Sequence, residues 1–139
     1  MDTGSENNGN STEINEDFKS QSNLHKAVIQ GNIESTKLLL QNGGNINQID
    51  NLGKSTLHLA ILHDQKEITE ILMKNGANVN AADKNGFTPL HIATQLNQSY
   101  LVEKLIKHSA VVGSPTKRYL RPIHIAAENG FLTIVLVEL

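Results

Sequence analysis

The chain has 139 residues, a formal net charge of −2 and 38% hydrophobic residues, which is the size and composition of one folded domain. It contains no cysteine, so disulfides, thiolate catalysis and cysteine-ligated zinc are excluded. The near-neutral charge gives no electrostatic case for binding nucleic acid, and no apolar run approaches the roughly 18 residues of a membrane helix. Because the N-terminus has no secretory signal, we expect a protein of the cytoplasm, the nucleus or both.

The segment 1–16 differs in composition from the rest of the chain. It carries four acidic residues, no basic ones, and only Ile14 as an internal large apolar group. A segment of this kind cannot bury enough apolar surface to offset the entropy lost on ordering. The sequence therefore predicts a disordered acidic tail over 1–16 and a folded domain over 17–139.

The rest of the chain is an internal repeat with a constant period. Four histidines recur at equal spacing, each two residues before an alanine: His25, His58, His91 and His124. Such a strict period indicates one structural unit copied along the chain. The predicted units are 17–49, 50–82, 83–115 and a partial one at 116–139.

Each unit is predicted to hold two short helices and a turn. Ser22, Ser55 and Thr88 stand where a side-chain oxygen should cap the first helix. Two apolar clusters follow in each unit, and residues 83–86 (DKNG) have the chemistry of a tight hairpin turn.

The run TPLHIA over 88–93, the constant period of the histidines and the run GANVN over 76–80 together resemble ankyrin repeats. The resemblance covers 17–139. It implies an all-α solenoid of about four repeats, in which stacked helix-turn-helix units are joined by β-hairpin loops. It does not identify a partner, because this architecture serves many unrelated functions.

The two ends of the repeat region depart from the pattern. Lys26 replaces an apolar residue of the later units, which suits an end repeat facing solvent. Glu138 occupies a position that leucine holds in the other units (Leu39, Leu72 and Leu105). We therefore expect the last helix to shift register or fray, and the chain to be a piece or a truncated product of a longer solenoid.

The spaced histidines do not form a metal cluster. Packed helices lie about 8–10 Å apart, whereas zinc–nitrogen bonds of about 2.0–2.1 Å bring fellow ligands within roughly 4 Å of each other. Each imidazole is instead predicted to form structural hydrogen bonds within and between repeats.

No constellation of catalytic residues emerges. The run GKS over 53–55 lacks the earlier glycine of a phosphate loop, since Gln48 stands there. The adjacent His63 and Asp64 fit a solvated helix end. The sequence predicts a protein that is not an enzyme and uses no cofactor.

The resemblance implies a binding surface on the concave side, made of hairpin tips and the exposed side of the first helices. Phe87 is the expected anchor, because aromatic side chains dominate interface energetics. An alternative is that Leu52, Leu62 and Leu96 tuck between neighbouring repeats. The full set of positions carried over is Leu52, Lys54, Leu62, His63, Lys84, Phe87, Leu96, Lys117, Arg118 and Leu120.

The third hairpin breaks the pattern. Residues 111–115 (VVGSP) replace the asparagine-rich version, and Tyr119 replaces a glycine within the basic cluster Lys117, Arg118 and Arg121. A solvated hairpin is one interpretation. The other is a contact site for an acidic or phosphorylated partner segment, which also includes Tyr119.

Asn47 and Asn80 resemble the site that an asparaginyl hydroxylase modifies in ankyrin repeats. The acidic residue favoured two positions earlier is absent, since Asn45 and Asn78 stand there. The alternative is that both asparagines hold the loops by side-chain hydrogen bonds.

The sequence thus predicts a monomeric, non-catalytic module that binds another protein and neither nucleic acid nor membrane. One alternative is a fragment of a larger ankyrin-containing enzyme, channel or ubiquitin-ligase adaptor whose activity lies outside this chain. Another is an inhibitor resembling the ankyrin-type inhibitors of Rel transcription factors.

Overall fold

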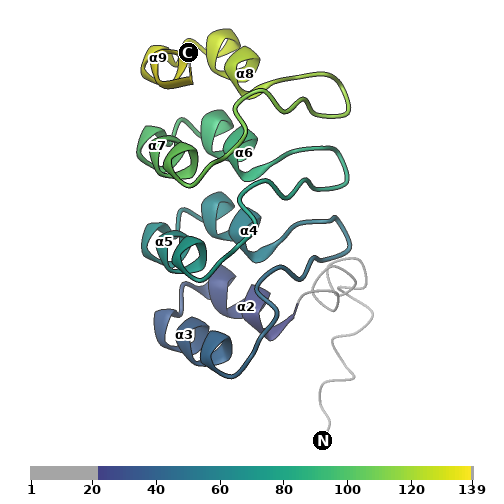
Figure 1. The fold of residues 1–139 in the computed structure, drawn as a ribbon, viewed down its shortest axis with the longest axis vertical. Coiled ribbons are helices and arrows are strands. Elements are labelled where there is room, and N and C mark those ends of the chain that lie inside the picture. Colours follow the sequence, from purple (N-terminus) through teal and green to yellow (C-terminus); the bar gives the residue numbers. More distant parts are fainter. Residues whose placement is uncertain (1–21, 139) are drawn as a thin grey trace, which may run out of the picture.

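The computed structural model describes residues 22–138, so the predicted disordered tail over 1–16 lies outside the described residues. The described part forms four helix pairs stacked along one axis (Figure 1). The helices are α2 (Asn23–Gln30), α3 (Ile33–Gln41), α4 (Thr56–Leu62), α5 (Lys66–Lys74), α6 (Pro89–Gln95), α7 (Ser99–Lys107), α8 (Pro122–Glu128) and α9 (Leu132–Glu138). None of these helices is long and apolar enough to cross a membrane.

The helices form two layers. The inner helices α2, α4, α6 and α8 pack in sequence on one another, and the outer helices α3, α5, α7 and α9 lie on one side of them. Long loops project from the opposite side of the inner layer (Figure 1). This arrangement confirms the predicted all-α solenoid of about four repeats.

The loops between units contain turns and one isolated bridge in place of regular strands. Within residues 22–138 the only bridge of β type joins Ile49 and Ser55. The second loop closes through a hydrogen bond from the Asp83 N–H to the Phe87 carbonyl at 2.9 Å. The predicted β-hairpin loops are therefore turn-like extensions without a sheet.

Hydroxyl side chains begin the first three inner helices, as predicted. Ser55 Oγ accepts from the backbone N–H of His58 at 3.3 Å, and the Ser55 N–H donates to His58 Nδ1 at 3.0 Å. The same reciprocal cap joins Ser22 to His25 and Thr88 to His91. Two otherwise unpaired N–H groups are thereby satisfied at each helix start.

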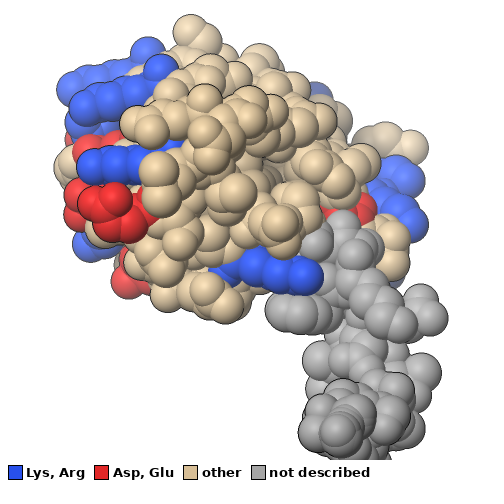
Figure 2. All heavy atoms as spheres, turned by 90° about the horizontal axis from the view of Figure 1, so that it is seen from below, with Lys and Arg blue, Asp and Glu red and all other residues tan. Residues whose placement is uncertain are grey.

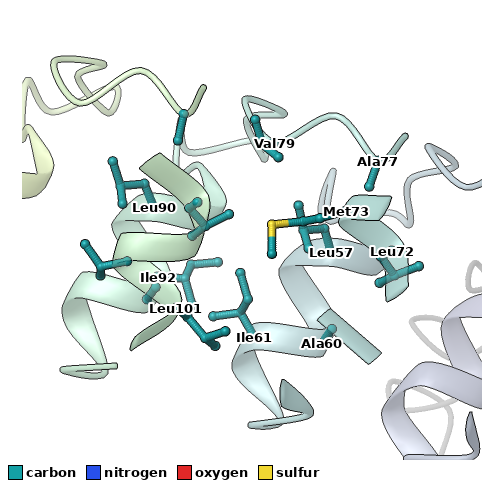
Figure 3. Close-up of a cluster of buried hydrophobic side chains, with 14 of the residues drawn as sticks. Leu57, Ala60, Ile61, Leu72, Met73, Ala77, Val79, Leu90, Ile92 and Leu101 are labelled. Atoms are coloured by element: carbon teal, nitrogen blue, oxygen red, sulfur yellow. The ribbon is translucent and has the colours of Figure 1, made fainter. Parts of the chain in front are cut away.

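Aliphatic side chains hold neighbouring units together. Figure 3 shows residues from α4 and α5 facing residues from the next unit, among them Leu57, Ile61, Leu90 and Leu101. These four side chains are fully buried. Each buried aliphatic side chain of this size contributes about 1.5–3 kcal/mol, so the stack is stabilised mainly by this interior.

The last helix keeps its register, so the predicted shift or fraying is wrong. Helix α9 runs through Glu138, whose side chain is buried and accepts a hydrogen bond from Thr94 Oγ1 at 2.9 Å. One unit earlier the corresponding positions are the buried pair Ile61 and Leu105. Burial raises the pKa of the Glu138 carboxyl, and the Thr94 hydrogen bond opposes this only in part.

Candidate protein-binding site

Three buried histidines link each unit to the next. His58 Nδ1 accepts from the Ser55 N–H, and Nε2 lies 2.8 Å from the Phe87 carbonyl oxygen of the following loop. Because a backbone N–H can only donate and a carbonyl can only accept, the ring is the neutral form protonated at Nε2. His25 and His91 make the equivalent contacts to the Lys54 and Leu120 carbonyls at 3.1 and 2.9 Å. These contacts confirm the predicted structural hydrogen bonds for His25, His58 and His91, whereas the bond described for His124 is within its own unit, from the Arg121 N–H at 3.1 Å.

Burial lowers the pKa of all three imidazoles, and the acceptor carbonyls offset this only in part. The residues whose carbonyls are held (Lys54, Phe87 and Leu120) are the last residues of successive loops. The histidines therefore fix the loops relative to the helices. They position the candidate site without belonging to it.

Each loop is closed by one side chain at its start. Asp83 Oδ1 accepts from the N–H groups of Asn85 and Phe87, both at 2.9 Å. Asp50 does the same in the first loop. In the third loop Thr116 Oγ1 takes this role, with longer distances of 3.2 Å to the N–H groups of Arg118 and Leu120. The third loop thus loses a carboxylate that the other two contain.

The loops stack directly on one another through their backbones. The Lys84 N–H donates to the Leu52 carbonyl, and the Lys117 N–H donates to the Asn85 carbonyl, both at 3.0 Å. A Cβ atom at Gly86, where φ is +84°, would lie only 2.8 Å from the Lys117 nitrogen. The glycine is required by this close approach as well as by its φ.

The contact between the first two loops is charged. Lys54 Nζ lies 2.6 Å from Asp83 Oδ2, and the Asp83 side chain is 3% exposed. Burial alone would raise the pKa of Asp83, but hydrogen bonds from Lys54 and from backbone N–H groups lower it. Lys54, which we predicted as a partner contact, is therefore engaged within the molecule.

The same contact between the second and third loops has no charge, because Phe87 and Thr116 occupy the two positions. A pocket of about 390 Å³ opens there. It is lined by Asn85, Phe87, Thr116, Lys117, Arg118 and Leu120. The structure thus brings together four side chains predicted from the sequence (Phe87, Lys117, Arg118 and Leu120).

Two lining residues, Asn85 and Thr116, were missed by the sequence prediction. The signal for Thr116 was available, since it replaces an aspartate that the repeat places in both earlier loops, Asp50 and Asp83. Phe87 is half-buried, with its ring edge-on to His91 at a centroid distance of 5.6 Å. The ring is therefore held in place at the pocket wall.

The remaining predicted residues lie outside this pocket. Leu52, Leu62 and Leu96 are 49%, 40% and 44% exposed, so the alternative that they tuck between repeats is wrong. Leu62, the exposed His63 and Leu96 lie at the C-terminal ends of α4 and α6. A seven-residue helix is about 10 Å long, which separates them from the loop tips.

Tyr119 stands in the position that glycine fills in the earlier loops. Its side chain is 80% exposed and its φ is 65°, in the left-handed region. A bulky residue there costs about 1–3 kcal/mol of backbone strain. Where Gly53 and Gly86 leave room for the backbone of the next loop, Tyr119 presents an aromatic ring.

The basic side chains of the third loop are not neutralised within the described part of the chain. The ion pairs found in residues 22–138 are Lys54–Asp83 and Lys104–Glu70, so neither includes Lys117 or Arg118. Figure 2, viewed from the α2 end, shows charges along the outer helices and again on the loop side, with a mostly uncharged surface between.

Both candidate hydroxylation residues are exposed and bonded to the next unit. Asn47 Oδ1 accepts from the Asn78 N–H at 2.8 Å, and Asn80 Oδ1 accepts from the Val111 N–H at 2.8 Å. These bonds support the structural interpretation of the two asparagines. Their modification stays a prediction.

The comparison with protein families agrees with the fold. The family model of ankyrin repeats, three copies, matches residues 6–83, 24–116 and 75–137. Because these matches span most of the sequence, the chain belongs to the ankyrin-repeat family. No curated protein matches it.

Proposed function

We propose that this protein is a non-catalytic module that binds another protein with its loop tips and inner helices. The observation that carries the proposal is the pocket between the second and third loops. There Phe87 and Leu120 offer apolar surface beside two cations that no carboxylate of the described residues neutralises. Family membership supports the proposal, because ankyrin repeats generally mediate protein–protein interaction. The module acts as a monomer in the cytoplasm or the nucleus.

The exposed leucines extend this surface. Leu52 lies at the tip of the first loop, and Leu62 and Leu96 lie at the C-terminal ends of α4 and α6, all at least 40% exposed. We propose that they add apolar contacts around the pocket. Phe87 is the expected centre of the contact, with the leucines as its surroundings.

The double variant Leu52→Ala and Phe87→Ala is expected to lose its partners in affinity purification followed by mass spectrometry, while its circular dichroism stays helical. Losing the Phe87–His91 ring contact should also cost about 0.5–1.5 kcal/mol of stability. A matched control is Leu38→Ala with Leu132→Ala, two exposed leucines on the outer helices. The proposal fails if the first variant captures the same proteins as wild type, or if the control loses them equally.

A further inference from the structure

We infer that the pocket between the second and third loops binds an extended acidic segment of a partner protein, with one apolar side chain seated on Phe87 and Leu120. The inference rests on the proposed function and names the chemistry of the partner. Three features carry it: the charge of the loops, their spacing and the departures of the third loop.

The three loops present an excess of positive charge. Residues 50–54, 83–87 and 116–120 contain four basic and two acidic side chains. Both acidic side chains, Asp50 and Asp83, are buried and accept hydrogen bonds from their own loops. Asp83 also neutralises Lys54, so the exposed charge at the tips is basic.

The basic residues follow the repeat. Lys84 and Lys117 are both exposed and stand at equivalent positions of successive loops. Packed units lie about 8–10 Å apart. An extended segment of polyproline II type rises about 3.1 Å per residue with three residues per turn, so its residues i and i+3 share a face about 9 Å apart. Carboxylates at i and i+3 would therefore meet Lys84 and Lys117 together.

The apolar part of the pocket comes from Phe87 of the second loop and Leu120 of the third, and Lys117 lines the same pocket. Phe87 and Leu120 are half-buried, so each keeps an exposed surface in a pocket that no described carboxylate lines. A side chain at i+1 or i+2 of the segment would cover them. The ligand expected here therefore has acidic residues at i and i+3 and an apolar residue at i+1 or i+2.

Three substitutions at the third loop weaken its structure and favour this ligand. Thr116 removes a carboxylate that would repel the ligand, Tyr119 adds an exposed ring at the expense of backbone strain, and Arg121 replaces the hydroxyl that caps the earlier inner helices. The Arg121 Nε donates instead to the Gly113 carbonyl at 3.0 Å. Each change lowers local stability. Together they leave a loop tip that is basic and aromatic, followed by a helix, α8, that no hydroxyl side chain caps.

The test is fluorescence anisotropy with the full chain and a fluorescein-labelled ten-residue peptide that carries Asp at i and i+3 and Leu at i+2. We expect this peptide to bind at 50 mM NaCl and to bind less tightly as salt rises, because exposed ion pairs are screened. Binding should fall about tenfold or more in Lys117→Glu with Arg118→Glu. The matched control, Lys37→Glu with Lys66→Glu, changes the net charge equally on the outer helices and should bind like wild type.

Four results would overturn the inference. The first is equal binding of a peptide with Lys in place of Asp, and the second is unchanged binding by the Lys117→Glu, Arg118→Glu variant. The third is binding only when phosphoserine replaces the aspartates. The fourth is an affinity for the peptide that rises about tenfold when Asp2, Glu6, Glu13 and Glu16 are changed to amides. The third would make the site a phosphate site, and the last would make the chain's own N-terminal segment its occupant. If the double variant Leu52→Ala and Phe87→Ala still lost its partners, the proposed function would stand without this ligand.

Discussion

The free energy of unfolding is expected to fall steeply as the pH drops from 7.5 to 5.5. Burial lowers the pKa of His25, His58 and His91 below the ordinary value of 6.5. The unfolded chain therefore binds more protons than the folded one once the pH falls below about 6.5. The stability contributed by the neutral rings is present above that pH and is lost as the pH falls toward the folded pKa values.

The size of the effect follows from the number of rings. Each pKa unit between the unfolded and the folded ring corresponds to about 1.36 kcal/mol, and the three rings shift in the same direction, so their contributions add. The raised pKa of Glu138 acts in the opposite sense, since its carboxyl gains a proton more readily when folded. Its single group offsets only part of the loss.

Urea denaturation at pH 7.5, 6.5 and 5.5 measures this slope. His124 is exposed, so the variant His124→Gln serves as a control that should keep the wild-type slope. An unfolding free energy that is constant over this range would show that the buried histidines are not held neutral, and the scaffold role assigned to them would be wrong.

The variant Gly86→Ala is expected to lose about 3 kcal/mol of stability and to disturb the pocket. An added Cβ would meet the Lys117 nitrogen at 2.8 Å and the Thr116 Cα at 3.0 Å, both backbone atoms that cannot turn aside. Part of the loss, about 1 kcal/mol, comes from the positive φ alone. The remainder, about 1–3 kcal/mol, is the cost of pushing the third loop away.

Gly76→Ala separates these two contributions. Gly76 has a φ of +90° and no atom within 4 Å of an added Cβ, so only the backbone contribution applies. Urea denaturation of both variants should therefore give a clearly larger loss for Gly86→Ala. Equal losses would mean that the direct stacking of the loops contributes nothing to stability.

Most of the fold could be predicted because its signals are local and repeated. The histidine, the hydroxyl residue before it and the alanine after it recur at constant spacing in the first three units. In each of these units the hydroxyl residue and the histidine form the same reciprocal cap. The position of Glu138 could not be predicted in this way. Its burial depends on Thr94, far earlier in the chain, which offers a hydroxyl where the previous unit has Ile61.

The candidate site could be predicted only in part. Mapping the binding positions of the repeat onto the sequence predicted Phe87 and Leu120, which line the pocket. It also predicted Lys54, whose charge Asp83 neutralises. Side chains that pair across loops do not stand at equivalent positions of the repeat, so a comparison of equivalent positions does not reveal them. The absence of a carboxylate at Thr116 becomes meaningful only once Phe87 is seen beside it.

We propose that binding is carried by the positions that break the repeat, and the exposed Tyr119 is one of them. The variant Tyr119→Gly restores the glycine of the earlier loops and should raise the unfolding free energy by about 1 kcal/mol through relief of backbone strain. The decisive measurement is the affinity of this more stable variant for the acidic peptide. We predict that its affinity for the peptide is lower than that of the wild type by about threefold or more, because an exposed aromatic side chain is lost. Unchanged or tighter binding by the more stable variant would show that this departure from the repeat does not serve binding.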